Sequence, residues 1–208
     1  MYATMEVRWF HRGMLPADVV TWFQQGERCP VEPAQRVDHY LRVAEGASLG
    51  IKLREGHIEI KQRHQQFGMT QLHLQVSGLV EHWRKWSLPL IEPNDQPGHV
   101  AQPASDWIGV YKERRLQRYR ITNGAELIAI PATHYPDQGC DLELTRVQAS
   151  DRTWWTLSFE AFGDESVLQQ NFALATKRIL GRADPPVLGV EDSYGYPRWL
   201  QILSEDGK

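Results

Sequence analysis

Three features are scarce or absent in this 208-residue chain: cysteine, long apolar runs, and a large excess of charge of one sign. The two cysteines, Cys29 and Cys140, lack metal-ligand spacing. They favour a reduced, cytoplasmic setting and leave open a single disulfide. No apolar run approaches the ~20 residues that span a bilayer, and the N-terminus lacks the pattern of a signal peptide. The net charge of −3, with no recognised nucleic-acid motif, argues against a nucleic-acid partner.

What is present indicates one globular domain. Apolar residues make up 41% and charged residues 24% of the chain, which is ordinary for a globular protein long enough to bury a real core. A proline-rich stretch, 89–106, has little periodicity and is predicted to be a long loop. The aromatic C-terminal tail, 182–208, is predicted to pack on the body of a single domain that covers residues 1–208.

Charged side chains recur at every second position in two segments, 51–64 and 108–121. A period of two places successive side chains on opposite faces of a strand, so these strands have one cationic and one largely apolar face. The cationic positions are Lys52, Arg54, Lys61, Arg63, Lys112 and Arg114. One such face is usually solvated surface, whereas several in one chain, with carboxylates on other strands, suggest a sheet curled around an anion. Alternation alone leaves open which face points inward.

The remaining periodicity and turn signals complete a mainly β, α+β fold. Strands are predicted at 4–10, 36–43, 49–55, 57–64, 71–88 (one strand or a pair), 107–121, 126–135, 140–147 and 153–162. Helices are predicted from the segment 15–18 to Gly26, and over 165–180 with Asp164 as the N-cap. Sequential antiparallel strands with one polar face predict an antiparallel barrel of about eight strands with flanking helices.

The order of several short motifs resembles that of a known family. The matching segments are Glu6-Val7-Arg8, Asp38-His39-Tyr40, 49–54, 58–63, 110–114 and 157–163. Together they are similar to the CYTH, or triphosphate tunnel metalloenzyme, superfamily over roughly residues 2–180. The resemblance implies a barrel whose tunnel binds a small phosphorylated anion: a triphosphate-bearing compound or inorganic polyphosphate.

The resemblance also implies roles for particular residues. Phosphate-binding positions would be Arg8, Lys52, Arg54, Lys61, Arg63, Lys112 and Arg114. Glu6 and Glu160 would bind Mg²⁺ or Mn²⁺, with Asp141 or Glu143 as helpers, in a metal-dependent phosphohydrolase. Thr4 and Ser158 stand where the family has further carboxylates, so one ion is expected rather than two.

Other functions stay open. The two missing carboxylates motivate a non-catalytic anion-binding module on the same scaffold. Eight tryptophans motivate an unrelated barrel for an apolar or chromophoric ligand. The Gly-x-Ser-x-Gly segment at 46–50 precedes a strand pattern rather than a helix, so it is interpreted as a hairpin loop and not as a hydrolase nucleophile.

Overall fold

A computed structural model of the chain describes residues 1–25, 32–43, 46–90, 106–122 and 125–205. The helices are α1 (Ala17–Gln24), α2 (Leu168–Leu180) and α3 (Tyr196–Glu205), with short 3-10 turns η1 (Glu165–Val167) and η2 (Val190–Asp192). The strands are β1 (Tyr2–Arg12), β2 (Ala34–Leu41), β3 (Leu49–Arg54), β4 (His57–His73), β5 (Val76–Pro89), β6 (Trp107–Ile121), β7 (Leu127–Ile130), β8 (Gly139–Ala149) and β9 (Arg152–Phe162).

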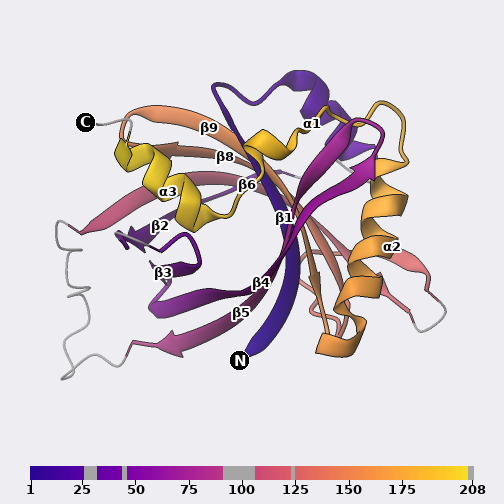
Figure 1. Ribbon diagram of the computed structural model, residues 1–208, viewed down its shortest axis with the longest axis horizontal. Coiled ribbons are helices and arrows are strands. Elements are labelled where there is room, and N and C mark those ends of the chain that lie inside the picture. The colour runs from indigo at the N-terminus through magenta and orange to yellow at the C-terminus, as the bar shows by residue number, and fades with distance from the viewer. Residues whose placement is uncertain (26–31, 44–45, 91–105, 123–124, 206–208) are drawn as a thin grey trace.

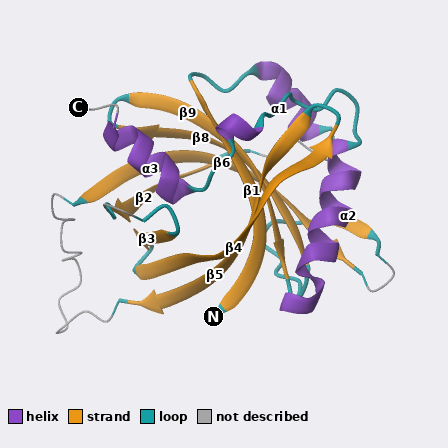
Figure 2. Cartoon of the chain, in the orientation of Figure 1, coloured by secondary structure: helices purple, strands orange, loops and turns teal. Residues whose placement is uncertain are grey.

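Eight of the strands form a closed antiparallel barrel, which confirms the fold predicted from the sequence. The strand order is β2-β3-β4-β5-β1-β9-β8-β6, and β2 pairs with β6 to close the sheet. The short β7 pairs with β6 beside this ring. Figure 1 shows the barrel with α2 on one side and α3 on the other, and Figure 2 shows how far strands dominate the chain. Among the described residues, no helix is long and apolar enough to cross a bilayer.

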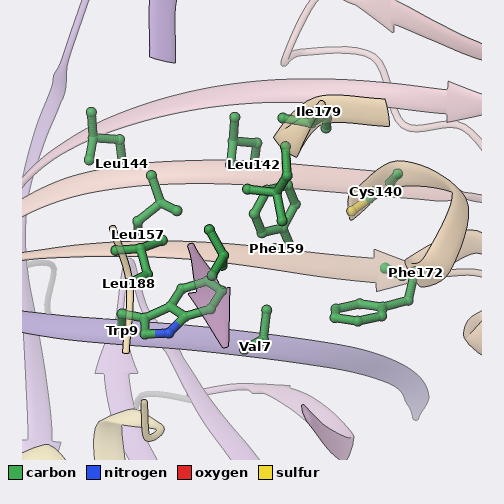
Figure 3. Close-up of a cluster of buried hydrophobic side chains, with 14 of the residues drawn as sticks. Val7, Trp9, Cys140, Leu142, Leu144, Leu157, Phe159, Phe172, Ile179 and Leu188 are labelled. Carbon is green, nitrogen blue, oxygen red and sulfur yellow. The ribbon is translucent and has the colours of Figure 1, made fainter. Parts of the chain in front are cut away.

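The main apolar core lies outside the barrel, between the strands and the helices. On β1, Val7 and Trp9 belong to this core, while Glu6 and Arg8 face the opposite way into the barrel. The same alternation on β8 and β9 directs apolar side chains onto α2, as Figure 3 shows for Phe159 and its neighbours. Burying each large apolar side chain contributes about 1.5–3 kcal/mol. The barrel interior is therefore left to the polar face of each strand.

Helix α3 closes one end of the barrel. Inward-facing side chains from the ends of five strands pack on it, among them Phe10 of β1 and Tyr40 of β2. Phe10 stacks against Trp199 of α3 with ring centroids 5.1 Å apart, and Tyr40 stacks against Tyr196 at 5.2 Å. This aromatic cluster makes the interior a cavity with one closed end. The sequence analysis did not predict a third helix in the tail, although Tyr196, Trp199, Leu200 and Leu203 recur there at helical spacing.

The structure corrects several predicted boundaries. The segment 71–88 divides at a turn, so that its first residues end β4 and the rest form β5. The strand predicted over 126–135 is shorter in the structure, where β7 covers only Leu127–Ile130. Asp164 precedes the 3-10 turn and makes no capping hydrogen bond through its side chain. Most of the predicted loop 89–106 lies outside the described residues, as do Gly26 and Cys29.

Candidate functional site: an ionic cavity inside the barrel

The barrel encloses a cavity of about 720 Å³ whose wall is strongly ionic. Its cationic lining side chains are Arg8, Arg36, Lys52, Arg54, Lys61, Lys85, Lys112, Arg114 and Arg118. Its carboxylate lining side chains are Glu6, Glu55, Glu59, Asp141, Glu143 and Glu160. Cations outnumber carboxylates among these residues, even when buried Asp38, behind the wall, is added. The cationic strand faces thus point inward, which settles the question that the alternation left open.

Six of the seven predicted phosphate-binding residues line this cavity; Arg63 does not. Arg63 donates a hydrogen bond of 2.6 Å to Glu81, and its guanidinium lies 5.9 Å from the centre of the Trp83 ring. The strand faces predicted by the period of two are correct, but a β-bulge follows Arg63 in the pairing of β4 with β5. Glu81 satisfies the charge of Arg63.

A chain of ion pairs crosses the middle of the cavity. Arg8 donates from Nε to Glu6 at 2.8 Å and from a terminal nitrogen to Glu143 at 3.0 Å. Glu143 also accepts from Arg114, and Glu6 accepts from Lys61. Burial would raise the pKa of Glu6, but Lys61 and Arg8 outweigh it and hold that pKa at about 2. The same competition, won by Arg114 and Arg8, keeps the pKa of Glu143 well below its usual range.

A second cluster surrounds Asp38 near the closed end. Lys112, Lys52 and Arg36 place nitrogen atoms 2.8, 3.4 and 3.1 Å from its carboxylate oxygens. Lys112 also donates a 2.7 Å hydrogen bond to the hydroxyl of Tyr40. Burial lowers the pKa of Lys112 to about 7, although Asp38 acts in the opposite direction. One carboxylate therefore serves three cations, and Lys112 holds its proton weakly.

Two lysines and two glutamates face one another nearer the open end. Lys61 of β4 stands opposite Lys85 of β5, and Glu6 of β1 stands opposite Glu160 of β9. Lys61 contacts Glu6, and Lys85 contacts Glu160. Burial, followed by the charge of Lys61, lowers the pKa of Lys85 well below its ordinary value.

The predicted metal ligands lie on neighbouring strands, and all of them face the cavity. Glu160 is opposite Glu6 on one side and Asp141 on the other, and Glu143 follows two residues after Asp141. Each of the four contacts at least one Lys or Arg side chain. In the part of the chain that the structure describes, no three His, Cys, Asp or Glu side chains form a metal-binding group. The donor chemistry suits Mg²⁺ or Mn²⁺, but a metal ion would have to compete with these cations.

Hydroxyls occupy the two positions where the resemblance expects further carboxylates. Thr4 and Ser158 are both almost fully buried. Their side-chain oxygens have no hydrogen-bond partner among the described residues. They add polarity to the interior without charge.

Among the lining residues that the sequence interpretation missed are Lys85, Arg118, Arg36 and Tyr196. Lys85 and Arg118 continue alternating patterns that were already visible, after Glu81 and Trp83 on β5 and after Arg114 on β6. Arg36 precedes the Asp38 motif by two residues and shares its face. Tyr196 had no usable signal, because it reaches the cavity only through the placement of α3.

Comparisons with known proteins give no family for this chain. No protein-family model matches it, and no curated protein sequence matches it. An eight-stranded barrel alone does not identify the CYTH superfamily, so that relationship stays a prediction based on the ordered motifs.

Proposed function

We propose that the cavity binds a small phosphorylated anion, either a triphosphate-bearing compound or inorganic polyphosphate. The observation that carries this proposal is the enclosed excess of cations, with Lys61 and Lys85 directly opposed. Like charges at opposed positions are destabilising, and a bound polyanion relieves that repulsion. The planar guanidinium groups of Arg8 and Arg114 suit phosphoryl oxygens, for which Arg offers paired donors.

An apolar or chromophoric ligand has weaker support. Several tryptophans that suggested it are used in packing: Trp9 and Trp22 lie in the core beneath the helices, and Trp199 lies in the aromatic cluster at the closed end. Trp83 and Trp86 do line the cavity, but they stand among Lys, Arg and Glu side chains. Moving an apolar ligand into such a wall would leave many charged groups desolvated without partners.

The proposal extends to metal-dependent hydrolysis of the bound anion. When bound, Mg²⁺ or Mn²⁺ would supply charge neutralisation of phosphoryl oxygens and activation of water. Glu6 and Glu160 are the residues proposed to hold it, with Asp141 or Glu143 assisting. Lys61 and Lys85 contact these two glutamates. A polyphosphate that attracted both lysines would leave the two carboxylates available to a metal ion.

Calorimetric titration with tripolyphosphate tests the binding claim, and two arginines on neighbouring strands supply a matched pair of variants. Arg114 contacts Glu143 inside the barrel, whereas Arg146 makes the corresponding β6–β8 contact with Glu113 and is not in the cavity wall. We expect Arg114→Met to weaken binding by roughly tenfold or more, because a charge-assisted contact is lost. Arg146→Met should bind like the wild type. Equal affinities, or no binding by the wild type, would remove the proposal.

Phosphate release separates an enzyme from a binding module. Tripolyphosphate and thiamine triphosphate would be incubated with Mg²⁺ or Mn²⁺, and a Glu160→Ala variant would serve as the control. Turnover by the wild type above that control supports a metal-dependent phosphohydrolase. Binding in the presence of EDTA without turnover in metal would instead identify a non-catalytic anion-binding module, the second candidate function.

A further inference from the structure

We infer that Tyr196, at the start of the C-terminal helix, is a ligand-contacting residue whose hydroxyl donates a hydrogen bond to the anion at the closed end of the cavity. This inference rests on the proposed anion-binding function and adds a specific neutral donor to it. Its basis is the position of the Tyr196 ring among the cationic side chains at the closed end of the cavity.

The ring of Tyr196 fills the space between the two ionic clusters. Its centroid is 4.0 Å from Nζ of Lys112 and 5.0 Å from Cζ of Arg8. Its opposite contacts are aromatic: Tyr40 stacks nearly parallel to it, and Phe10 meets it at its edge. The ring is therefore fixed by packing while its surroundings are positively charged, so rotation of the side chain away from the cavity would break several contacts.

The hydroxyl of Tyr196 is the unexplained feature of this arrangement. It is buried, yet it makes no hydrogen bond within the described residues. Leaving a buried hydroxyl unpaired costs free energy, and such groups need a partner that the protein itself does not supply. Tyr40, stacked against the same ring, shows the contrast because its hydroxyl is bonded to Lys112. Tyr196 lines the cavity, and we place the anion where it would accept a hydrogen bond from this hydroxyl.

The electrostatic setting favours donation by the hydroxyl. Burial, opposed by the charge of Arg8, raises the pKa of Tyr196 above its usual range, so the phenol keeps its proton through the neutral range. Gly195 and Pro197 also line the cavity. The first turn of α3 therefore faces the space in which the anion would bind. The positive end of the helix dipole adds to the favourable field. The C-terminal tail thus completes the site rather than only covering the barrel.

Titration of the full-length protein with tripolyphosphate in EDTA tests this role. Tyr196→Phe removes only the hydroxyl, and Tyr111→Phe is the control because Tyr111 is not in the cavity wall and bonds to Glu113. We expect roughly tenfold to a hundredfold weaker binding for Tyr196→Phe and wild-type affinity for Tyr111→Phe. The melting temperature of Tyr196→Phe should be no lower than that of the wild type, because no internal hydrogen bond is lost.

The outcomes distinguish this inference from the proposal on which it rests. Binding by the wild type with the same affinity in Tyr196→Phe overturns the role of Tyr196 and leaves the anion-binding function standing. Binding that is weakened in Tyr196→Phe together with a lower melting temperature identifies a structural hydroxyl and also overturns the inference. No binding by the wild type overturns both.

Discussion

Lys61 and Lys85 occupy directly opposed positions on β4 and β5, and both side chains line the same cavity. Cross-strand neighbours of like charge destabilise a sheet. The barrel offsets this repulsion by pairing Lys61 with Glu6 and Lys85 with Glu160. Such an arrangement is poorly explained by folding stability alone, because apolar side chains at these positions would fill a barrel more favourably. The proposed ligand, which carries negative charge, would account for it.

Replacing Lys85 together with its partner Glu160 should therefore stabilise the free protein and weaken ligand binding. Because burial and Lys61 lower its pKa in the folded state, the unfolded chain binds the proton more tightly, and wild-type stability rises with pH as the ordinary lysine pKa is approached. We expect the double replacement Lys85→Met with Glu160→Leu, which leaves neither partner unpaired, to raise the free energy of unfolding at pH 7 by about 1 kcal/mol and to flatten its increase between pH 7 and 10. Urea denaturation measures both. A less stable variant with the same pH slope would contradict this prediction.

Lys112 should make anion binding depend on pH near neutrality. Because its pKa is about 7, Lys112 loses its positive charge in the unbound protein as the pH rises above neutrality. Binding of an anion restores that proton, so affinity for tripolyphosphate contains a contribution that is lost as the pH rises above about 7.

The variant Lys112→Gln isolates this contribution, because the titration of the ligand itself is common to both proteins. We expect wild-type affinity to exceed that of Lys112→Gln by roughly tenfold at pH 6, with the ratio shrinking toward pH 8.5. Calorimetric titration in buffers of different ionisation enthalpy should show more proton uptake by the wild type than by Lys112→Gln. A constant affinity ratio across this pH range would argue against a titrating Lys112.

Much of this site could be predicted from the sequence, because the alternation of side chains along a β-strand depends only on neighbouring residues. Arg8 and Lys52 alternate with apolar neighbours, and strand geometry alone assigns each to one face of its strand. The sequence could not say whether that face was inside, because an inverted barrel has the same alternation. The decision comes from packing: Val7 and Trp9 on the other face belong to a core that includes residues of α2, which is distant in sequence.

The closed end of the cavity could not be predicted from the sequence in the same way. Tyr196 reaches Lys112 through contacts between the C-terminal helix and the barrel, which no short-range pattern encodes. The ion pairs of the proposed metal ligands could not be predicted from the sequence either. That Glu6 meets Lys61, 55 positions later, depends on the shear and closure of the sheet rather than on either local motif.

Glu6 should act as a structural counterion whether or not it also binds a metal. Its pKa of about 2 lies below the unfolded value, so its stabilising effect is present above about pH 4.3 and is lost as the pH falls toward 2. We expect Glu6→Gln to destabilise the protein by about 3 kcal/mol at pH 7, because buried Arg8 loses a partner. The stability difference should shrink between pH 4.3 and 2. A difference that did not change with pH would mean that volume or shape, not charge, causes the loss.

Gly78 in β5 should be required for the core beneath α2 to pack against the barrel. A Cβ built at this position would lie 2.6 Å from Cγ2 of Val7 and 2.8 Å from Cζ2 of Trp9, both fully buried. We expect Gly78→Ala to lower the free energy of unfolding by about 1–3 kcal/mol, because the side chains it meets belong to a filled core and cannot retreat without strain.

Gly109 in β6 supplies the matched control, since a Cβ there meets nothing closer than 3.8 Å. Alanine restricts the unfolded chain more than glycine does, so Gly109→Ala should be neutral or stabilising by a few tenths of a kcal/mol, to about 1 kcal/mol at most. Urea denaturation of both variants gives the comparison. Equal effects of the two substitutions would show that the cost at Gly78 comes from the loss of glycine in a strand and not from Val7 and Trp9. The packing that turns the ionic face inward would then need another explanation.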